Sequence, residues 1–103
     1  MHREIERHRA EIAELCRRYH VRRLDVFGSA AEEGEFEPEC SDVDLLAEFE
    51  TEEEPLRFAE YLKLRDALSE VLARPVDLVM AGSVRNPYVQ AEIERTKEPV
   101  YAA

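Results

Sequence analysis

Two aspartates separated by one residue open an apolar run in the middle of this sequence. Asp42 and Asp44 begin the segment DVDLLAEF, residues 42–49, whose middle has the apolar content of a buried strand. Side chains alternate along a strand, so both carboxylates point to one face, about 7 Å apart, while Val43 and Leu45 point to the core. Two like charges there repel each other and lose water. The segment therefore predicts a strand whose charged face binds a cation.

A second apolar run carries a third carboxylate. Residues 74–82 read RPVDLVMAG, with Asp77 in the middle of a Val- and Leu-rich strand pattern. If this strand lies beside residues 42–49, Asp77 reaches the face of Asp42 and Asp44. Carboxylate oxygens suit Mg²⁺ or Mn²⁺ rather than zinc, and three carboxylates can hold two metal ions that align attack and departure at a phosphorus. Alternatively, Asp77 forms a buried salt bridge to Arg65 or Lys63.

A glycine and a serine lie upstream of these aspartates. Residues 22–27, RRLDVF, predict a short strand that ends at Gly28, and Ser29 is a candidate helix cap. Glycine lets the backbone approach a phosphate closely. A serine hydroxyl and N–H at a helix N-terminus favour an anion. Gly28 and Ser29 are therefore the candidate nucleotide-binding residues, and a nucleoside triphosphate is the expected substrate.

The charge balance limits the partners. The chain has 103 residues, with 14 Lys and Arg against 24 Asp and Glu, a net charge of −10. Direct binding of nucleic acid relies on Lys and Arg and is disfavoured, whereas metal cations and basic protein surfaces are attracted. No apolar run reaches the length of a membrane span, and the charged N-terminus is unlike a signal peptide. Cys16 and Cys40 lack metal spacing, and reduced thiols are typical of a cytoplasmic protein.

The remaining pattern predicts one small α/β domain over residues 1–103. Its expected order is α-β-β-α-β-α, a small mixed β-sheet flanked by helices. The tail EPVYAA is expected to return to the sheet edge or pack on it. Helices are expected over residues 2–19, from Pro55 to about Ala73, and from Pro87 to near Lys97, the last capped by Asn86 and anchored by Tyr88, Ile93 and Val89.

These motifs together resemble a known family. The segment FGSAAEEGEFEPECSDVDLLAEFE resembles the signature of the minimal nucleotidyltransferase (MNT) domains of the DNA polymerase β superfamily, a strand ending in Gly-Ser followed by Asp-x-Asp on the next strand. RPVDLVM resembles the strand with the third carboxylate, and RNPYVQAEIERTKEPVYAA the C-terminal helix and tail of short bacterial members. The resemblance implies the nucleotidyltransferase fold, with Asp42, Asp44 and Asp77 as catalytic and metal-binding residues.

The same resemblance implies an activity and a partner. Many such domains are MntA-like antitoxins paired with HEPN ribonuclease toxins, and active members transfer AMP from ATP to a tyrosine of the toxin. The expected function is therefore a protein adenylyltransferase that uses ATP and Mg²⁺ or Mn²⁺. An antitoxin that neutralises a basic partner by stoichiometric contact is the alternative, and the oligomeric state stays open, a homo-oligomer included.

One departure from the family pattern affects the triphosphate. The family often places an arginine soon after Gly-Ser, where this chain has Ala30, Ala31, Glu32 and Glu33. Carboxylates repel phosphate oxygens. The isolated chain is therefore expected to bind ATP weakly, and transfer activity depends on whether the remaining site compensates.

Overall fold

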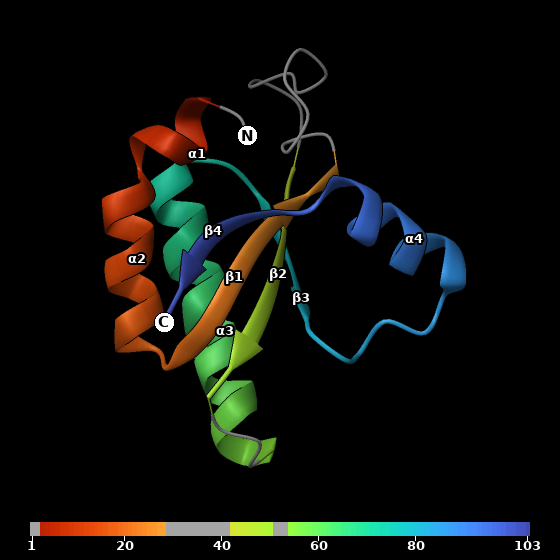
Figure 1. The fold of residues 1–103 in the computed structure, drawn as a ribbon. Helices are drawn as coiled ribbons and strands as arrows, with labels where there is room; N and C mark the ends of the chain where they lie inside the picture. Colours follow the sequence, from red (N-terminus) through yellow and green to blue (C-terminus); the bar gives the residue numbers. More distant parts are fainter. Residues whose placement is uncertain (1–2, 29–41, 51–53) are drawn as a thin grey trace.

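A four-stranded mixed sheet forms the centre of the protein. The computed structural model describes residues 3–28, 42–50 and 54–103, and its sheet has the order β3-β2-β1-β4 (Figure 1). β1 pairs antiparallel with β2 and β4, whereas β3 runs parallel to β2. The expected mixed sheet flanked by helices is confirmed. The strands are β1 (Val21–Phe27), β2 (Val43–Phe49), β3 (Val76–Met80) and β4 (Glu98–Ala102).

The N-terminal helix is divided where one helix over residues 2–19 was expected. α1 (Arg3–Arg7) and α2 (Arg9–Arg18) meet at His8. Arg9 reaches the far end of the chain, because its guanidinium donates to the carbonyl oxygens of Val100 at 3.2 Å and Pro99 at 3.1 Å. These bonds attach the start of α2 to β4.

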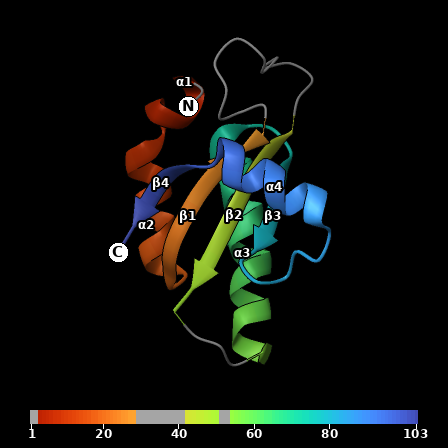
Figure 2. The same cartoon turned by 45° about the vertical axis from the view of Figure 1, so that its right-hand side comes forward.

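One face of the sheet is apolar and is covered by α2 and α3 (Glu54–Leu72). Figure 2 shows α3 behind the sheet and α4 in front of it. The strands alternate as expected, so that Leu24, Val26 and Leu45 are buried on the core side. The helices contribute a matching set of buried residues, namely Ile5, Ile12, Leu15, Cys16, Leu64, Leu68 and Leu72.

The last helix, α4 (Pro87–Thr96), covers part of the other face. The expected cap is confirmed, because Asn86 Oδ1 accepts from the N–H of Tyr88 at 2.8 Å. Two of its three expected anchors are wrong: Tyr88 is 85% exposed and Val89 40% exposed, whereas Ile93 is buried. The first turn of α4 extends away from the sheet (Figure 1), so only the second half of the helix packs on strands.

The tail returns to the sheet as β4, at the edge beside β1. This strand extends the predicted order α-β-β-α-β-α by one element. It also brings the end of α4 next to the end of β1, since Lys97 joins the helix and the strand directly. Among the helices described, none is long and apolar enough to cross a membrane.

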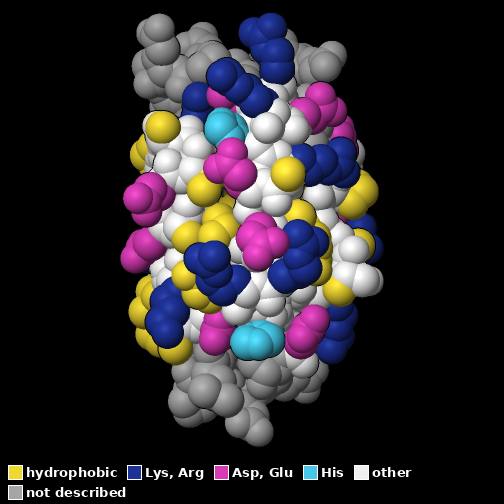
Figure 3. Space-filling view, turned by 90° about the vertical axis from the view of Figure 1, so that its left-hand side faces the viewer, with side chains coloured by type: hydrophobic (Ala, Val, Ile, Leu, Met, Phe, Trp, Pro, Cys, Tyr) yellow, Lys and Arg dark blue, Asp and Glu magenta, His cyan; other side chains and the backbone are white. Residues whose placement is uncertain are grey.

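The acidic charge is concentrated in one stretch of sequence. Residues 29–56 contain twelve Asp and Glu and no Lys or Arg, so the rest of the chain carries a net charge of +2. On the face formed by α1 and α2, Lys and Arg side chains are interspersed with Asp and Glu (Figure 3). The net charge of −10 is therefore not spread evenly along the chain.

Candidate functional site

The three candidate aspartates lie at neighbouring ends of β2 and β3. Asp44 pairs with Asp77 in the parallel register, and paired residues of adjacent strands point to the same face. Asp42 directly precedes β2, two residues before Asp44. Asp42 and Asp77 are exposed, and Asp44 is half-buried. The fold therefore brings all three to the sheet face opposite the core.

Asp77 does not occupy the salt-bridge position that was the alternative for it. It is exposed rather than buried on β3. Arg65, a cation on α3, pairs instead with its neighbour Asp66, with Nη2 and Oδ1 3.3 Å apart. Asp77 is the register partner of Asp44 on the neighbouring strand. It therefore lies beside another carboxylate.

The carboxyl group of Asp44 is perturbed by its surroundings. Burial, followed by the negative charges of Asp77, Asp42 and Glu92, raises the pKa of its carboxyl from 3.8 to about 6. A half-buried carboxylate near three further carboxylates stabilises a bound cation, because the cation removes the repulsion among them. The charge pattern therefore fits the predicted metal site.

The donor chemistry also fits. Aspartate oxygens are the ligands that Mg²⁺ and Mn²⁺ prefer. Within residues 3–28, 42–50 and 54–103, no group of three or more His, Cys, Asp or Glu side chains is arranged closely enough to hold an ion. Asp42, Asp44 and Asp77 would hold the metal, and this assignment stays a prediction.

Gly28 packs directly against Asp44. Its φ is +69°, and a Cβ at this position would lie 2.8 Å from Oδ2 of Asp44. Glycine permits both the backbone conformation and the close approach. The N–H of Gly28 donates to Oγ1 of Thr96 at 2.8 Å. That N–H is thus engaged by α4. Ser29, the other residue of the predicted phosphate site, lies outside the described residues.

Two residues of α4, which the sequence did not indicate, also belong to the site. The hydroxyl of Thr96 accepts a hydrogen bond from Gly28 and donates one to the carbonyl oxygen of Glu92 at 2.7 Å. The negative charge of the Glu92 carboxylate helps to raise the pKa of Asp44. Their spacing of four residues places both on one face of the helix. That spacing was a readable signal, but only the packing of α4 shows which strand the face meets.

We expect Asp44→Asn to stabilise the protein when no metal is present. The pKa of Asp44 rises from 3.8 to about 6 on folding, so the stability of the wild type falls as the pH increases through this window. The asparagine of the variant does not titrate and causes no such loss of stability. The gain above pH 6 is on the order of 1 kcal/mol after discounting for solvent screening, or roughly 5 °C in Tm. Thermal unfolding in EDTA at pH 4 and pH 8 measures it.

The control for this prediction is Asp66→Asn, which removes an exposed carboxylate from α3. Its effect on Tm should be small at both pH values. Equal Tm changes for Asp44→Asn at pH 4 and pH 8 would show that the Asp44 carboxylate is not destabilised by its neighbours.

Several known proteins are similar to this chain in sequence or in fold. The family model described as "Nucleotidyltransferase domain" matches residues 9–100. The chain is 40% identical over 93 residues to "Putative protein adenylyltransferase MJ1379" of Methanocaldococcus jannaschii, covering 82% of this chain and 90% of that protein. It is 42% identical over 73 residues to "Protein adenylyltransferase MntA" of Thermococcus cleftensis, covering 71% and 69%.

Solved structures agree with the sequence matches. A structure described as a "putative minimal nucleotidyltransferase" superposes with a TM-score of 0.75 and 33% identity, covering 96% of both chains. A second has a TM-score of 0.61 and 18% identity, covering 96% of this chain and 73% of that chain. It belongs to a complex of a tri-AMPylated HEPN toxin from Shewanella oneidensis with an MNT antitoxin. Because the sequence identity is low, this similarity shows a shared fold and nothing more.

Proposed function

The chain belongs to the nucleotidyltransferase domain family, and on this basis we propose that it transfers AMP from ATP to a hydroxyl group of a HEPN-type toxin. The observation that carries the proposal is the carboxylate pair at the ends of β2 and β3. Asp44 and Asp77 are paired in register, and burial and neighbouring carboxylates raise the pKa of Asp44 to about 6. Such a site suits a divalent cation and the triphosphate that accompanies it.

The chain's own residues have distinct roles in this proposal. Asp42, Asp44 and Asp77 hold Mg²⁺ or Mn²⁺, which when bound neutralises the triphosphate and lowers the pKa of the acceptor hydroxyl. Gly28 keeps the Asp44 carboxylate in place, since it packs against Oδ2. Ser29 binds the phosphates. The acceptor oxygen bonds to the α-phosphorus, the α–β bridging bond breaks, pyrophosphate leaves, and the hydroxyl proton passes to Asp77 or to water.

The names of relatives support the type of acceptor. One relative is a protein adenylyltransferase MntA, and a chain with the same fold is an antitoxin bound to an AMPylated HEPN toxin. The acidic stretch of residues 29–56 complements a basic partner. We infer from these points that the acceptor is a HEPN-type protein.

Intact-mass spectrometry of the partner tests the activity. The purified chain is mixed with the partner, ATP and Mg²⁺, and we expect the partner to gain the mass of one or more AMP units. The control is α,β-methylene ATP, whose α–β linkage cannot break, and which should give no gain. Neutralisation of the toxin without any mass gain from ATP would contradict the transfer reaction.

A stoichiometric antitoxin is the second candidate function. It is favoured by the charge of residues 29–56, twelve acidic and no basic side chains, which can hold a basic surface without chemistry. This reading requires one antitoxin for each toxin. Titration of toxin activity at sub-stoichiometric antitoxin with ATP and Mg²⁺ separates the two, because only an enzyme neutralises an excess of toxin.

A further inference from the structure

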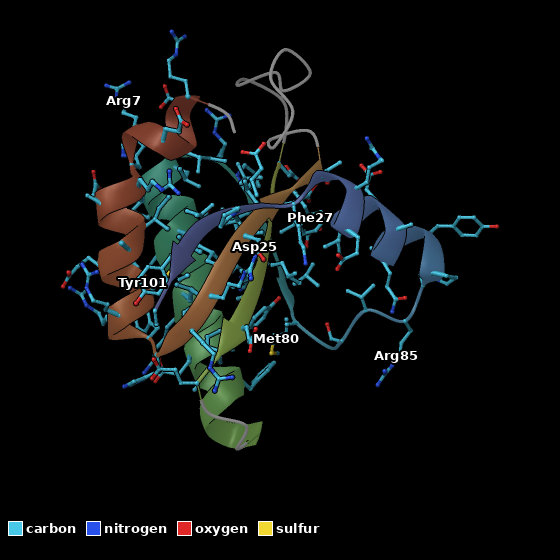
Figure 4. All side chains as sticks on the ribbon, in the orientation of Figure 1. Arg7, Asp25, Phe27, Met80, Arg85 and Tyr101 are labelled. Carbon is cyan, nitrogen blue, oxygen red and sulfur yellow. The ribbon has the colours of Figure 1, made fainter. Side chains whose placement is uncertain are left out.

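The two edges of the sheet differ in how much of their main chain is free. β3 and β4 are the edge strands in the order β3-β2-β1-β4, and Figure 4 shows Met80 at the end of β3 and Tyr101 on β4. An edge strand presents N–H and C=O groups with which another extended chain can pair. The state of these groups decides which edge can accept a further strand.

The β4 edge is poorly suited to a further strand. Pro99 has no N–H, and the carbonyl oxygens of Pro99 and Val100 accept from the guanidinium of Arg9 at 3.1 Å and 3.2 Å. Proline and a cationic side chain on an edge strand are common means of preventing edge-to-edge pairing. Strand addition at β4 is therefore disfavoured.

The bonds between β2 and β3 show which groups of β3 point outward. The N–H of Val43 donates to the carbonyl oxygen of Pro75 at 3.1 Å, and the N–H of Ala81 donates to that of Ala47 at 2.7 Å. Along a parallel strand, the main-chain groups of successive residues point alternately to one side and the other. The residues whose groups point away from β2 are therefore Val76, Leu78 and Met80.

Most of these outward groups are free. The carbonyl oxygen of Met80 accepts from the N–H and the hydroxyl of Ser83 at 3.1 Å and 2.6 Å. Within the described part of the chain, nothing bonds to the outward groups of Val76 or Leu78. α3 lies behind the sheet and α4 in front of it (Figure 2), so neither helix takes the place of a fifth strand. The β3 edge is therefore open to pairing.

A strand added at this edge would lie beside the aspartates. Asp77 is in the middle of β3 and shares a face with Asp44. The residue opposite Asp77 on an added strand points to the same face, with its Cβ about 5 Å from that of Asp77. A hydroxyl group on this residue is then next to a carboxylate that can take its proton.

We propose that an extended segment of the acceptor protein pairs with β3 as a fifth strand, and that this pairing places its hydroxyl-bearing side chain beside Asp77. The proposal rests on the AMP transfer proposed above and adds how the acceptor is recognised. Main-chain pairing supplies affinity for many sequences, and alternate side chains decide what reaches the site. The acceptor is therefore an extended segment with Ser, Thr or Tyr among basic or neutral residues, because Asp42, Asp44 and Asp77 repel acidic ones.

Amide hydrogen exchange, resolved by residue, tests the pairing on the wild-type chain. It is measured for the chain alone and with the purified HEPN-type partner, without ATP. We expect the amides of Val76 and Leu78 to exchange rapidly in the chain alone and at least about tenfold more slowly with the partner. The amides of Asp77 and Val79, which point toward β2, should exchange slowly in both samples.

A matched pair of substitutions at Val76 tests the role of the pairing in transfer. Val76→Pro removes an outward N–H and no bond to β2, at the first residue of an edge strand, where proline is tolerated. Val76→Ala keeps the N–H and accounts for the lost side-chain packing. The KM for the partner should be at least about tenfold higher for Val76→Pro than for Val76→Ala, whereas the KM for ATP should be the same for both.

Each possible outcome supports or overturns the proposal. If both variants transfer AMP with the same KM for the partner, the pairing is overturned while the proposed function stands. Protection of Val76 and Leu78 by the partner without any AMP transfer has the opposite meaning. If these amides become protected in the chain alone as its concentration is raised, a second copy occupies the edge and our proposal is wrong.

Discussion

Asp42→Asn combined with Asp44→Asn is expected to reduce AMP transfer by at least about a thousandfold. Loss of a single preorganised electrostatic contact to the reacting group costs about 10²–10³ in rate, and this variant removes two proposed metal ligands. The fold should be retained, because asparagine nearly keeps the volume of aspartate and the repulsion acting on Asp44 is relieved. Intact-mass spectrometry of the partner measures the transfer.

The same variant distinguishes the two functions in cells. An enzymatic antitoxin should lose protection against its toxin, whereas a stoichiometric one should keep it at native expression. Asp66→Asn, which removes an exposed carboxylate from α3, serves as the control and should transfer AMP normally. Full protection by the double variant would show that catalysis is not how this chain acts.

Gly28→Ala is expected to lower both stability and AMP transfer. An alanine at φ +69° is strained, by about 1–2 kcal/mol, and its Cβ would lie 2.8 Å from Oδ2 of Asp44. The carboxylate must therefore move, and a displacement of about 1 Å at a reacting centre can cost about 10²-fold in rate. Chemical denaturation and the transfer assay measure the two effects.

Gly82→Ala is the matched control. Gly82 also has a positive φ, of +85°, but a Cβ there meets nothing within 4 Å. Gly82→Ala should share the conformational cost and reduce transfer much less than Gly28→Ala does, because its Cβ displaces no carboxylate. If the two alanine variants reduce transfer equally, the contact between Gly28 and Asp44 does not position the site.

Most of the strands and helices were predictable because their signals are local. The alternation in residues 42–49 predicted which side of β2 faces the core, and Val43 and Leu45 are buried there. Asn86 and Pro87 predicted the start of α4, and the cap bond forms. The division at His8 and the exposure of Tyr88 were missed. Both depend on where a helix loses contact with the rest of the protein, which a local sequence pattern does not show.

The sequence by itself determined which residues of β2 share a face and that Asp77 lies in a strand, because side-chain alternation is a property of each strand alone. The tertiary structure decided what surrounds them. The parallel register set Asp77 beside Asp44, and the packing of α4 brought Glu92 toward Asp44 and Thr96 to Gly28. These contacts join residues far apart in the chain, and their geometry depends on the packing of whole elements rather than on any local pattern.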